Sequence, residues 1–340
     1  MYTFKRTEIN NQKASEFETK SMLYLLGMRN DSNEVDIITV DCFNDVTGAN
    51  QDFSKLWDVQ SKNHSSLPPS KIGESLSTLY DNYISSFDFH KFILFIPKLE
   101  RSYLKDSSLN IYGYENINDK QKKGLEDKLK EKINGNKSGA IPTLFYDFLE
   151  RVTFVEDNKK ISTYIKKLSK FKNKRSVSEE IYENIFIEIR NIQTALKNSY
   201  IENETITHPS QVLHFKRHIT KLQINTLLIN RLIGVDIFSF PGIPIPFLPF
   251  TKGLDEEEVK DLLQDCNENL SRAFFDKNGC KNFWKISEKI ISLLLSDLKK
   301  SVNDVYDELT SQYSIDTLYL TPITIQYMIS LIKTGLQNDN

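Results

Sequence analysis

Two short segments rich in β-branched and aromatic residues constrain the fold of this chain most. Residues 34–43 (EVDIITVDCF) and 55–62 (KLWDVQSK) have the composition of half-buried β-strands. A turn that contains Gly48 and Asn50 is expected to join them. Helical patterns precede and follow this pair of segments, and a sheet buries its apolar faces against such helices. The N-terminal part of the chain therefore predicts an α/β core.

The order of the predicted elements in this core is helix, strand, strand, helix, strand. The two helices are expected at 13–28 and 70–87, and the last strand at 89–96. A polar connector rich in lysine and glutamate follows, up to residue 140. We therefore expect a first domain that covers residues 1–140.

Three polar residues at the ends of the two predicted strands suggest a chemistry. Asp45 follows the first strand, and Gln60 and Lys62 close the second on the same face, because side chains alternate along a strand. Hydrolysis of a phosphodiester needs a cation that polarises the phosphate, an activated water and positive charge near the transition state. Asp45 is the expected Mg²⁺ ligand, Gln60 adds a neutral oxygen, and Lys62 supplies the ammonium. The pattern predicts a metal-dependent nuclease.

At these residues the chain resembles the PD-(D/E)xK nuclease superfamily, and more narrowly the Cap-type double-stranded DNA endonuclease domains of bacterial anti-phage systems such as CBASS and Lamassu. The matching positions are Asp41, Asp45, Gln60 and Lys62, in elements of the same order. The resemblance implies a restriction-endonuclease-like core, with a mixed sheet flanked by helices. It also implies Mg²⁺ or Mn²⁺ as cofactor, double-stranded DNA as substrate, and Glu18 of the first helix as a further catalytic metal ligand.

Two positions depart from the family pattern, and each motif residue has a simpler interpretation. Gln60 stands where the superfamily usually has an acid, and Asn44 precedes Asp45 where the narrower family often has paired acids. An Asp beside Asn and Gly is a common turn former. Gln and Lys at alternate strand positions commonly form a solvent-facing side. A Glu in the first turns of a helix is favoured by the macrodipole, which is the alternative for Glu18.

The remainder of the chain, residues 141–340, is expected to form a mainly α-helical domain for partner binding or oligomerisation. Amphipathic or capped helical patterns cover 178–200, 209–233, 255–275, 284–313 and 322–336. His214 and His218 lie four apart on one of these predicted helices, but no third ligand accompanies them, so a metal site there is disfavoured.

Partners follow from the resemblance. Nucleases of this family are gated either by a cyclic-nucleotide sensor domain, which is α/β, or by separate ATPase subunits. Because the second half of this chain has helical patterns, an SMC-like or HerA-like ATPase subunit is the favoured partner, with a homo-oligomer also possible. The chain is then the endonuclease effector of an anti-phage defence complex. The alternative is a catalytically inactive nuclease-fold scaffold in an ATPase assembly.

A basic segment is the candidate DNA-binding surface. Between residues 158 and 178 there are eight basic residues and no acid. The lysines expected to contact phosphate are Lys166, Lys167, Lys170, Lys172 and Lys174. The alternative is that these lysines are the solvated side of an amphipathic helix, because Ile161, Ile165 and Leu168 share one helix face.

One apolar segment cannot form a regular α-helix. Residues 238–250 (FSFPGIPIPFLPF) contain four prolines among almost entirely apolar neighbours. Such a segment is either an extended strap buried across the helices or an exposed docking surface for a partner. Burial is the expectation, because large exposed apolar patches are uncommon on monomers.

Composition indicates a folded protein outside the membrane. The chain is 39% hydrophobic and 11% aromatic, which argues against disorder. Its three cysteines are scattered without zinc-binding spacing, as is usual in a reducing compartment. A secretory signal and an apolar run of ~20 residues are both lacking, so we expect a cytoplasmic protein. The net charge of −2 means that any affinity for DNA must come from local patches.

Overall fold

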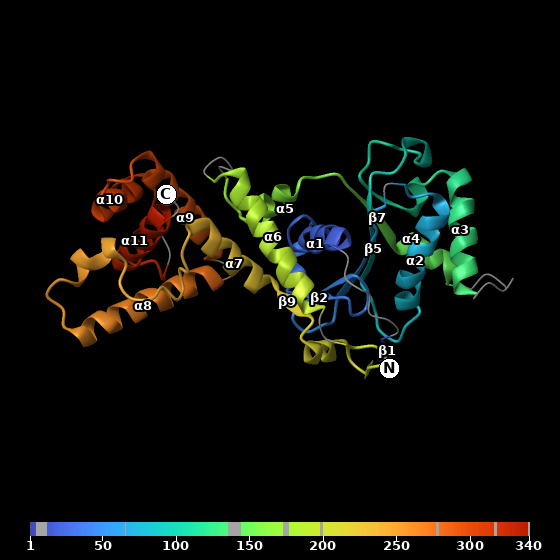
Figure 1. Cartoon of the computed structure of the whole chain (residues 1–340), viewed down its shortest axis with the longest axis horizontal. Coiled ribbons are helices and arrows are strands. Elements are labelled where there is room, and N and C mark those ends of the chain that lie inside the picture. The colour runs from blue at the N-terminus through green and yellow to red at the C-terminus, as the bar shows by residue number, and fades with distance from the viewer. Residues whose placement is uncertain are drawn as a thin grey trace. The chain divides into compact units, whose positions relative to one another are not determined.

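The computed structural model describes residues 1–4, 12–64, 66–134, 144–172, 177–197, 200–276, 279–315 and 318–338. These residues belong to two compact units. The first unit comprises Met1–Tyr164 and Phe186–Lys221, and the second comprises Ile165–Ile185 and Leu222–Asn340. Figure 1 shows strands gathered in the first unit and helices in the second.

A seven-stranded mixed sheet forms the centre of the first unit, with the strand order β6-β7-β5-β4-β3-β2-β9. The strands are β2 (Ile37–Val40), β3 (Val46–Ala49), β4 (Leu56–Ser61), β5 (Lys91–Pro97), β6 (Ile111–Gly113), β7 (Val152–Asp157) and β9 (His218–Thr220). Strands β2, β3 and β4 form an antiparallel meander, whereas β4, β5 and β7 are parallel. A separate pair joins β1 (Tyr2–Thr3) to β8 (Thr205–Ile206).

Helices cover both faces of the sheet. Those of the first unit are α1 (Gln12–Gly27), α2 (Pro69–Tyr83), α3 (Asp119–Ile133) and α4 (Phe145–Arg151). In Figure 1, α1 lies on one side of the sheet, and α2, α3 and α4 lie on the other. Alternation along β4 agrees with this layering, because Trp57 pairs with Gly48, which faces Leu25 of α1, whereas Gln60 contacts Thr78 of α2. The expected α/β core, with a mixed sheet between helices, is confirmed.

The first predicted strand, 34–43, differs from the structure. Strand β2 ends at Val40, the chain turns through residues 41–45, and β3 begins at Val46. We call residues 41–45 the hairpin loop. Asp41 adopts a left-handed φ of 52°, and its backbone N–H donates to the carbonyl of Asp45 at 3.1 Å, which closes the loop. Gly48, which was expected in a turn, lies inside β3.

The expected domain boundary at residue 140 also differs from the division of the chain. Strand β7 at 152–157 pairs with β5, and β9 at 218–220 pairs with β2, so both belong to the sheet of the first unit. The predicted helix at 209–233 is divided into a 3-10 helix (Pro209–Phe215), β9 and α7 (Lys221–Ile233). His214 and His218 therefore lie on different elements.

The second unit is helical, as expected. Its elements, and those that run between the units, are α5 (Ile161–Leu168), α6 (Glu179–Leu196), α7, α8 (Glu256–Phe275), α9 (Cys280–Ser296), α10 (Val302–Gln312) and α11 (Pro322–Asn338). Buried aromatic residues such as Phe274, Trp284 and Tyr327 form its core. In the helices of the described ranges, no segment has the length and apolarity needed to cross a bilayer.

The proline-rich segment 238–250 divides between core and surface. Its second half forms a 3-10 helix (Ile245–Thr251), in which Phe247 is fully buried against Tyr327 of α11. Phe238 packs on Phe274 of α8. Ile245 and Leu248 remain exposed, by 78% and 49%. The segment is therefore anchored in the core through its phenylalanines and presents two aliphatic side chains to solvent.

Candidate active site

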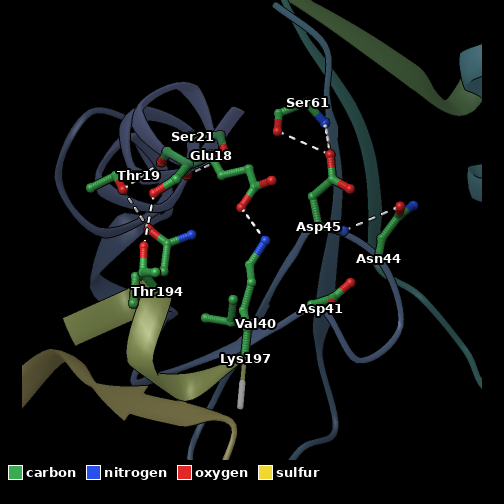
Figure 2. Close-up of polar contacts among 12 residues, drawn as sticks. Glu18, Thr19, Ser21, Val40, Asp41, Asn44, Asp45, Ser61, Thr194 and Lys197 are labelled. Carbon is green, nitrogen blue, oxygen red and sulfur yellow. Dashed lines mark hydrogen bonds and ion pairs between the residues drawn. The ribbon is translucent and has the colours of Figure 1, made fainter. Parts of the chain in front are cut away.

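Asp45 is the last residue of the hairpin loop, immediately before β3. Hydrogen bonds from the end of the neighbouring strand β4 hold its side chain. Because Val46 pairs with Val59, Asp45 lies next to Gln60 and Ser61 at the end of β4. Its Oδ2 accepts hydrogen bonds from the Ser61 backbone N–H at 2.7 Å and the Ser61 hydroxyl at 3.0 Å (Figure 2). The Gln60 amide nitrogen donates to the same oxygen at 2.5 Å. The structure thus brings together two of the predicted metal ligands.

Gln60 is buried, and both ends of its amide have partners. While Nε2 donates to Asp45, Oε1 accepts a hydrogen bond from the Thr78 hydroxyl of α2 at 2.6 Å. A half-turn of the amide reverses these roles, because a threonine hydroxyl can also accept from an amide nitrogen. In that orientation the Gln60 oxygen and the Asp45 carboxylate face the same point. Two oxygen donors suffice for Mg²⁺, which commonly keeps several waters, so these residues fit one such ion.

Lys62 directly follows the last residue of β4. Its backbone N–H donates to the carbonyl of Phe95 at 3.0 Å, which extends the pairing between β4 and β5 by one residue. Strand alternation therefore places Lys62 on the same face as Gln60. The side chain is partly exposed. The predicted spacing between Gln60 and Lys62 is preserved in the backbone.

Glu18 forms a buried ion pair that the sequence did not predict. It extends from α1, and its Oε2 accepts a hydrogen bond from the Lys197 ammonium at 2.6 Å (Figure 2). The two side chains are only 6% and 8% exposed. Burial lowers the pKa of Lys197, but attraction to Glu18, Asp41 and Asp45 outweighs burial and raises it above its ordinary value. Lys197 is therefore a permanent cation beside these carboxylates.

Asp41 has a cationic partner of its own. The fully buried Arg217, just before β9, donates to the Asp41 carboxylate at 3.0 Å and to the Asp41 carbonyl at 2.9 Å. Burial raises the pKa of Asp41, Lys197 and Arg217 lower it, and the net direction is upward. The predicted acid at Asp41 thus lies at the site but is held by Arg217.

A second buried hydrogen-bond network, formed by Asp58 and Asn82, also contacts the hairpin loop. Asp58, on β4, is fully buried and accepts a hydrogen bond from the Asn82 amide at 2.7 Å. Asn82 also donates to the Phe43 carbonyl in the hairpin loop at 3.0 Å, and it accepts from the Tyr2 hydroxyl at 2.7 Å. Burial raises the pKa of Asp58 to about 7, and the nearby charge of Asp45 acts in the same direction.

Asp45 and Gln60 line a pocket of about 850 Å³, whereas Glu18 and Lys62 are not among its lining residues. The hairpin loop, Gln60, Thr78 and Asn82 form part of its wall, and Met1 to Thr3 form another part. A cavity of this size holds a metal ion together with part of a nucleotide. Among the residues that the structure describes, no three His, Cys, Asp or Glu side chains are grouped as a metal site. Any ion here would therefore depend on Asp45, Gln60 and water.

The basic segment is partly neutralised within the second unit. Lys166 pairs with Glu179, and the backbone N–H of Lys172 donates to Glu288 at 3.0 Å. Lys167, Lys170 and Lys172 are exposed. Ile165 and Leu168 are buried, so α5 has the amphipathic character of the alternative interpretation. Lys174 lies outside the described residues.

Comparisons with known proteins do not assign the chain. No family model, no curated protein and no solved structure matches it. The interpretation of the site therefore depends on its own residues and on the order of the surrounding elements.

Proposed function

We propose that this protein hydrolyses phosphodiester bonds of double-stranded DNA with Mg²⁺ or Mn²⁺ at the Asp45–Gln60 pair. The observation that supports this most is the direct contact between Asp45, at the end of the hairpin loop, and Gln60 of β4, at the wall of a large pocket. The order around them, helix α1, strands β2 to β4, helix α2 and strand β5, is the expected order of helix, strands, helix and strand, with β3 added to the two strands expected between the helices. Lys62 directly follows Ser61, the last residue of β4.

The chain's own residues have distinct tasks in this proposal. Asp45 and Gln60 would hold the metal, which when bound polarises the phosphate and acidifies a water molecule. Thr78 orients the Gln60 amide. Ser61 holds one oxygen of Asp45 in place. The ammonium of Lys62 stabilises the negative charge that develops on the phosphate in the transition state.

The finer assignment is an effector subunit of a cytoplasmic anti-phage defence complex. The family resemblance implies control by an SMC-like or HerA-like ATPase, and the helical second unit supplies a surface for such a partner or for a second copy. Its exposed Ile245 and Leu248 are anchored beside a rigid aromatic core, which suits a docking position. Substitution of Leu248 therefore tests assembly without disturbing the buried Phe247.

An inactive scaffold is the second candidate. It is supported by the neutralisation of Glu18 by Lys197 and of Asp41 by Arg217, which leaves little negative charge for a metal. A plasmid assay separates the two functions. If the protein is a nuclease, it should cut plasmid in the presence of Mg²⁺ or Mn²⁺, either alone or with its ATPase partner, and cleavage should stop when the metal is chelated. If the protein is an inactive scaffold, it should bind its partner but leave the plasmid uncut under all of these conditions.

Gln60→Glu is expected to strengthen Mn²⁺ binding by about tenfold, because a second carboxylate adds charge to a site that has one. Thr78 can still donate to one oxygen of the new side chain, but the other oxygen replaces the Nε2 donor to Asp45, so without metal the two carboxylates would share a proton. The measurement is a calorimetric Mn²⁺ titration of the wild type and the variant. Gln121→Glu on α3, far along the chain from the pair, is the matched control. Equal affinities for wild type and Gln60→Glu would remove Gln60 from the ligand set.

The three exposed lysines of the basic segment provide a test of DNA contact. If Lys167, Lys170 and Lys172 bind phosphates, changing all three to Gln should weaken DNA binding and reduce the slope of log affinity against log salt by about 2 to 3. Binding to a short duplex at several salt concentrations measures this slope. Three exposed lysines outside both the basic segment and the candidate pocket, Lys105, Lys120 and Lys123, changed together, serve as the control. An unchanged slope assigns the segment to a solvated helix face.

A further inference from the structure

Side-chain hydrogen bonds join the last turn of α6 to α1. The Ser15 and Thr194 hydroxyls are hydrogen-bonded at 2.9 Å, and the Thr19 hydroxyl donates to the Gln193 side chain at 2.6 Å. Figure 2 shows Thr19 and Thr194 on facing helices beside Glu18 and Lys197. These contacts fix the end of α6 against α1. The position of Lys197, the first residue after α6, is thereby fixed as well.

Lys197 is held at both its backbone and its side chain. Its carbonyl accepts a hydrogen bond from Arg217 at 3.1 Å, and its ammonium donates to Glu18 at 2.6 Å. Arg217 in turn binds Asp41 in the hairpin loop. Two cations and two carboxylates thus form one buried arrangement that connects α1, the end of α6 and the loop that leads to Asp45. Side chains packed in this way have little freedom to move away from the site.

The charge of Lys197 acts on the metal position through space. The ammonium attracts Asp41 and Asp45 as well as Glu18, so it lies within electrostatic range of the Asp45 carboxylate. A divalent ion beside Asp45 would be repelled by this buried ammonium and attracted by Glu18. Because screening by water is weak at buried positions, removing either charge alone should change metal affinity by about tenfold or more.

We propose that Lys197 is a positioning residue that sets the affinity of the Asp45–Gln60 site for divalent metal, by acting as a resident counter-ion for its carboxylates. The inference rests on the proposed function, because it takes Asp45 and Gln60 as the metal ligands. Lys197 itself touches neither metal nor phosphate. Its charge, balanced by Glu18, keeps the cluster assembled without metal and keeps metal binding weak.

The test is a calorimetric Mn²⁺ titration of the full chain and matched variants. Lys197→Met removes the charge at similar length and leaves Glu18 negative, so Mn²⁺ should bind about tenfold more tightly or better. Lys197→Arg keeps the charge and should bind as the wild type does. The double variant Glu18→Gln with Lys197→Met removes both charges and should return close to the wild-type affinity. A merely structural role for Lys197 does not produce this charge-dependent order.

Equal affinities for the wild type and Lys197→Met would overturn the proposal. Should that variant not fold, Glu18→Gln alone tests the same charge balance in the other direction. It leaves the Lys197 ammonium unbalanced, so Mn²⁺ should bind about tenfold more weakly. An affinity equal to that of the wild type would also overturn the proposal. Asp45→Asn separates this inference from the proposed function. If Asp45→Asn binds Mn²⁺ like the wild type, the ligand assignment and with it the role of Lys197 are wrong. If Asp45→Asn loses binding but Lys197→Met changes nothing, only the role of Lys197 is wrong.

Discussion

Asp45→Asn and Lys62→Met should each slow metal-dependent DNA cleavage by about 100-fold or more, the usual cost of removing one group that stabilises transition-state charge. Asn keeps the size of Asp45 but removes the charge that holds the metal. Met keeps the length of Lys62 but removes its ammonium. The rate of conversion of supercoiled plasmid to nicked and linear forms, under conditions in which the wild type is active, measures the effect.

Controls for these variants come from α3. Asp127→Asn and Lys120→Met make the same chemical changes at exposed positions of that helix and should leave the cleavage rate unchanged. Circular dichroism and urea unfolding establish whether each variant is folded. Wild-type cleavage rates in either Asp45→Asn or Lys62→Met would show that the hydrolytic site lies elsewhere or that the cleavage is a contaminant.

The second large effect concerns stability and comes from Asp58. Its pKa in the folded state is about 7, which is about three pH units above the value near 3.9 of an Asp in an unfolded chain, because burial disfavours the charged form. The folded state therefore binds the proton more tightly than the unfolded state. Stability from this group is complete below about pH 4 and is lost as the pH rises through about 7, for a total of about 4 kcal/mol.

Asp58→Asn removes this pH dependence. At pH 5 the buried acid is neutral in the fold, whereas at pH 8 it is ionised at a position shielded from water, with one oxygen held by Asn82. The free energy of unfolding of the variant, relative to the wild type, should therefore rise by about 3 kcal/mol from pH 5 to pH 8. Urea unfolding at both values measures it. A difference that does not depend on pH would mean that Asp58 titrates normally.

The sequence predicted the central part of the fold because that part has strong local patterns. The expected helices at 13–28 and 70–87 correspond to α1 and α2, and the strand expected at 89–96 corresponds to β5. These elements bury apolar residues at regular spacing, which a sequence displays directly. The helical character of the second half follows from the same kind of signal.

The missed elements are those that depend on tertiary pairing. Strand β9 has three residues and pairs only at the edge of the sheet, so its sequence has little strand character of its own. The turn at residues 41–45 was missed because Asp41, rather than Gly, adopts the left-handed conformation there. Asp45 was nevertheless predicted beside Gln60, since either arrangement places it at a strand end.

The cationic half of the site could not be predicted from sequence. Lys197 lies 179 residues from Glu18, and Arg217 lies 176 residues from Asp41, so no local pattern relates the partners. Both cations lie within residues 141–340, which were expected to form the helical domain. Only the pairing of β9 with β2 brings Arg217 to the hairpin loop. The candidate carboxylates could be found from local sequence patterns, whereas their cationic partners reach them only through the tertiary fold.

The most direct test of the central claim is the position of a bound metal ion. Crystals of the wild-type protein soaked in Mn²⁺, measured with anomalous scattering, should show a single strong peak within coordination distance of the Asp45 carboxylate and the Gln60 side-chain oxygen. The amide of Gln60 should then be turned, with its nitrogen toward Thr78. A soak that produces no peak at this pair, or one only at a different set of ligands, would contradict the account.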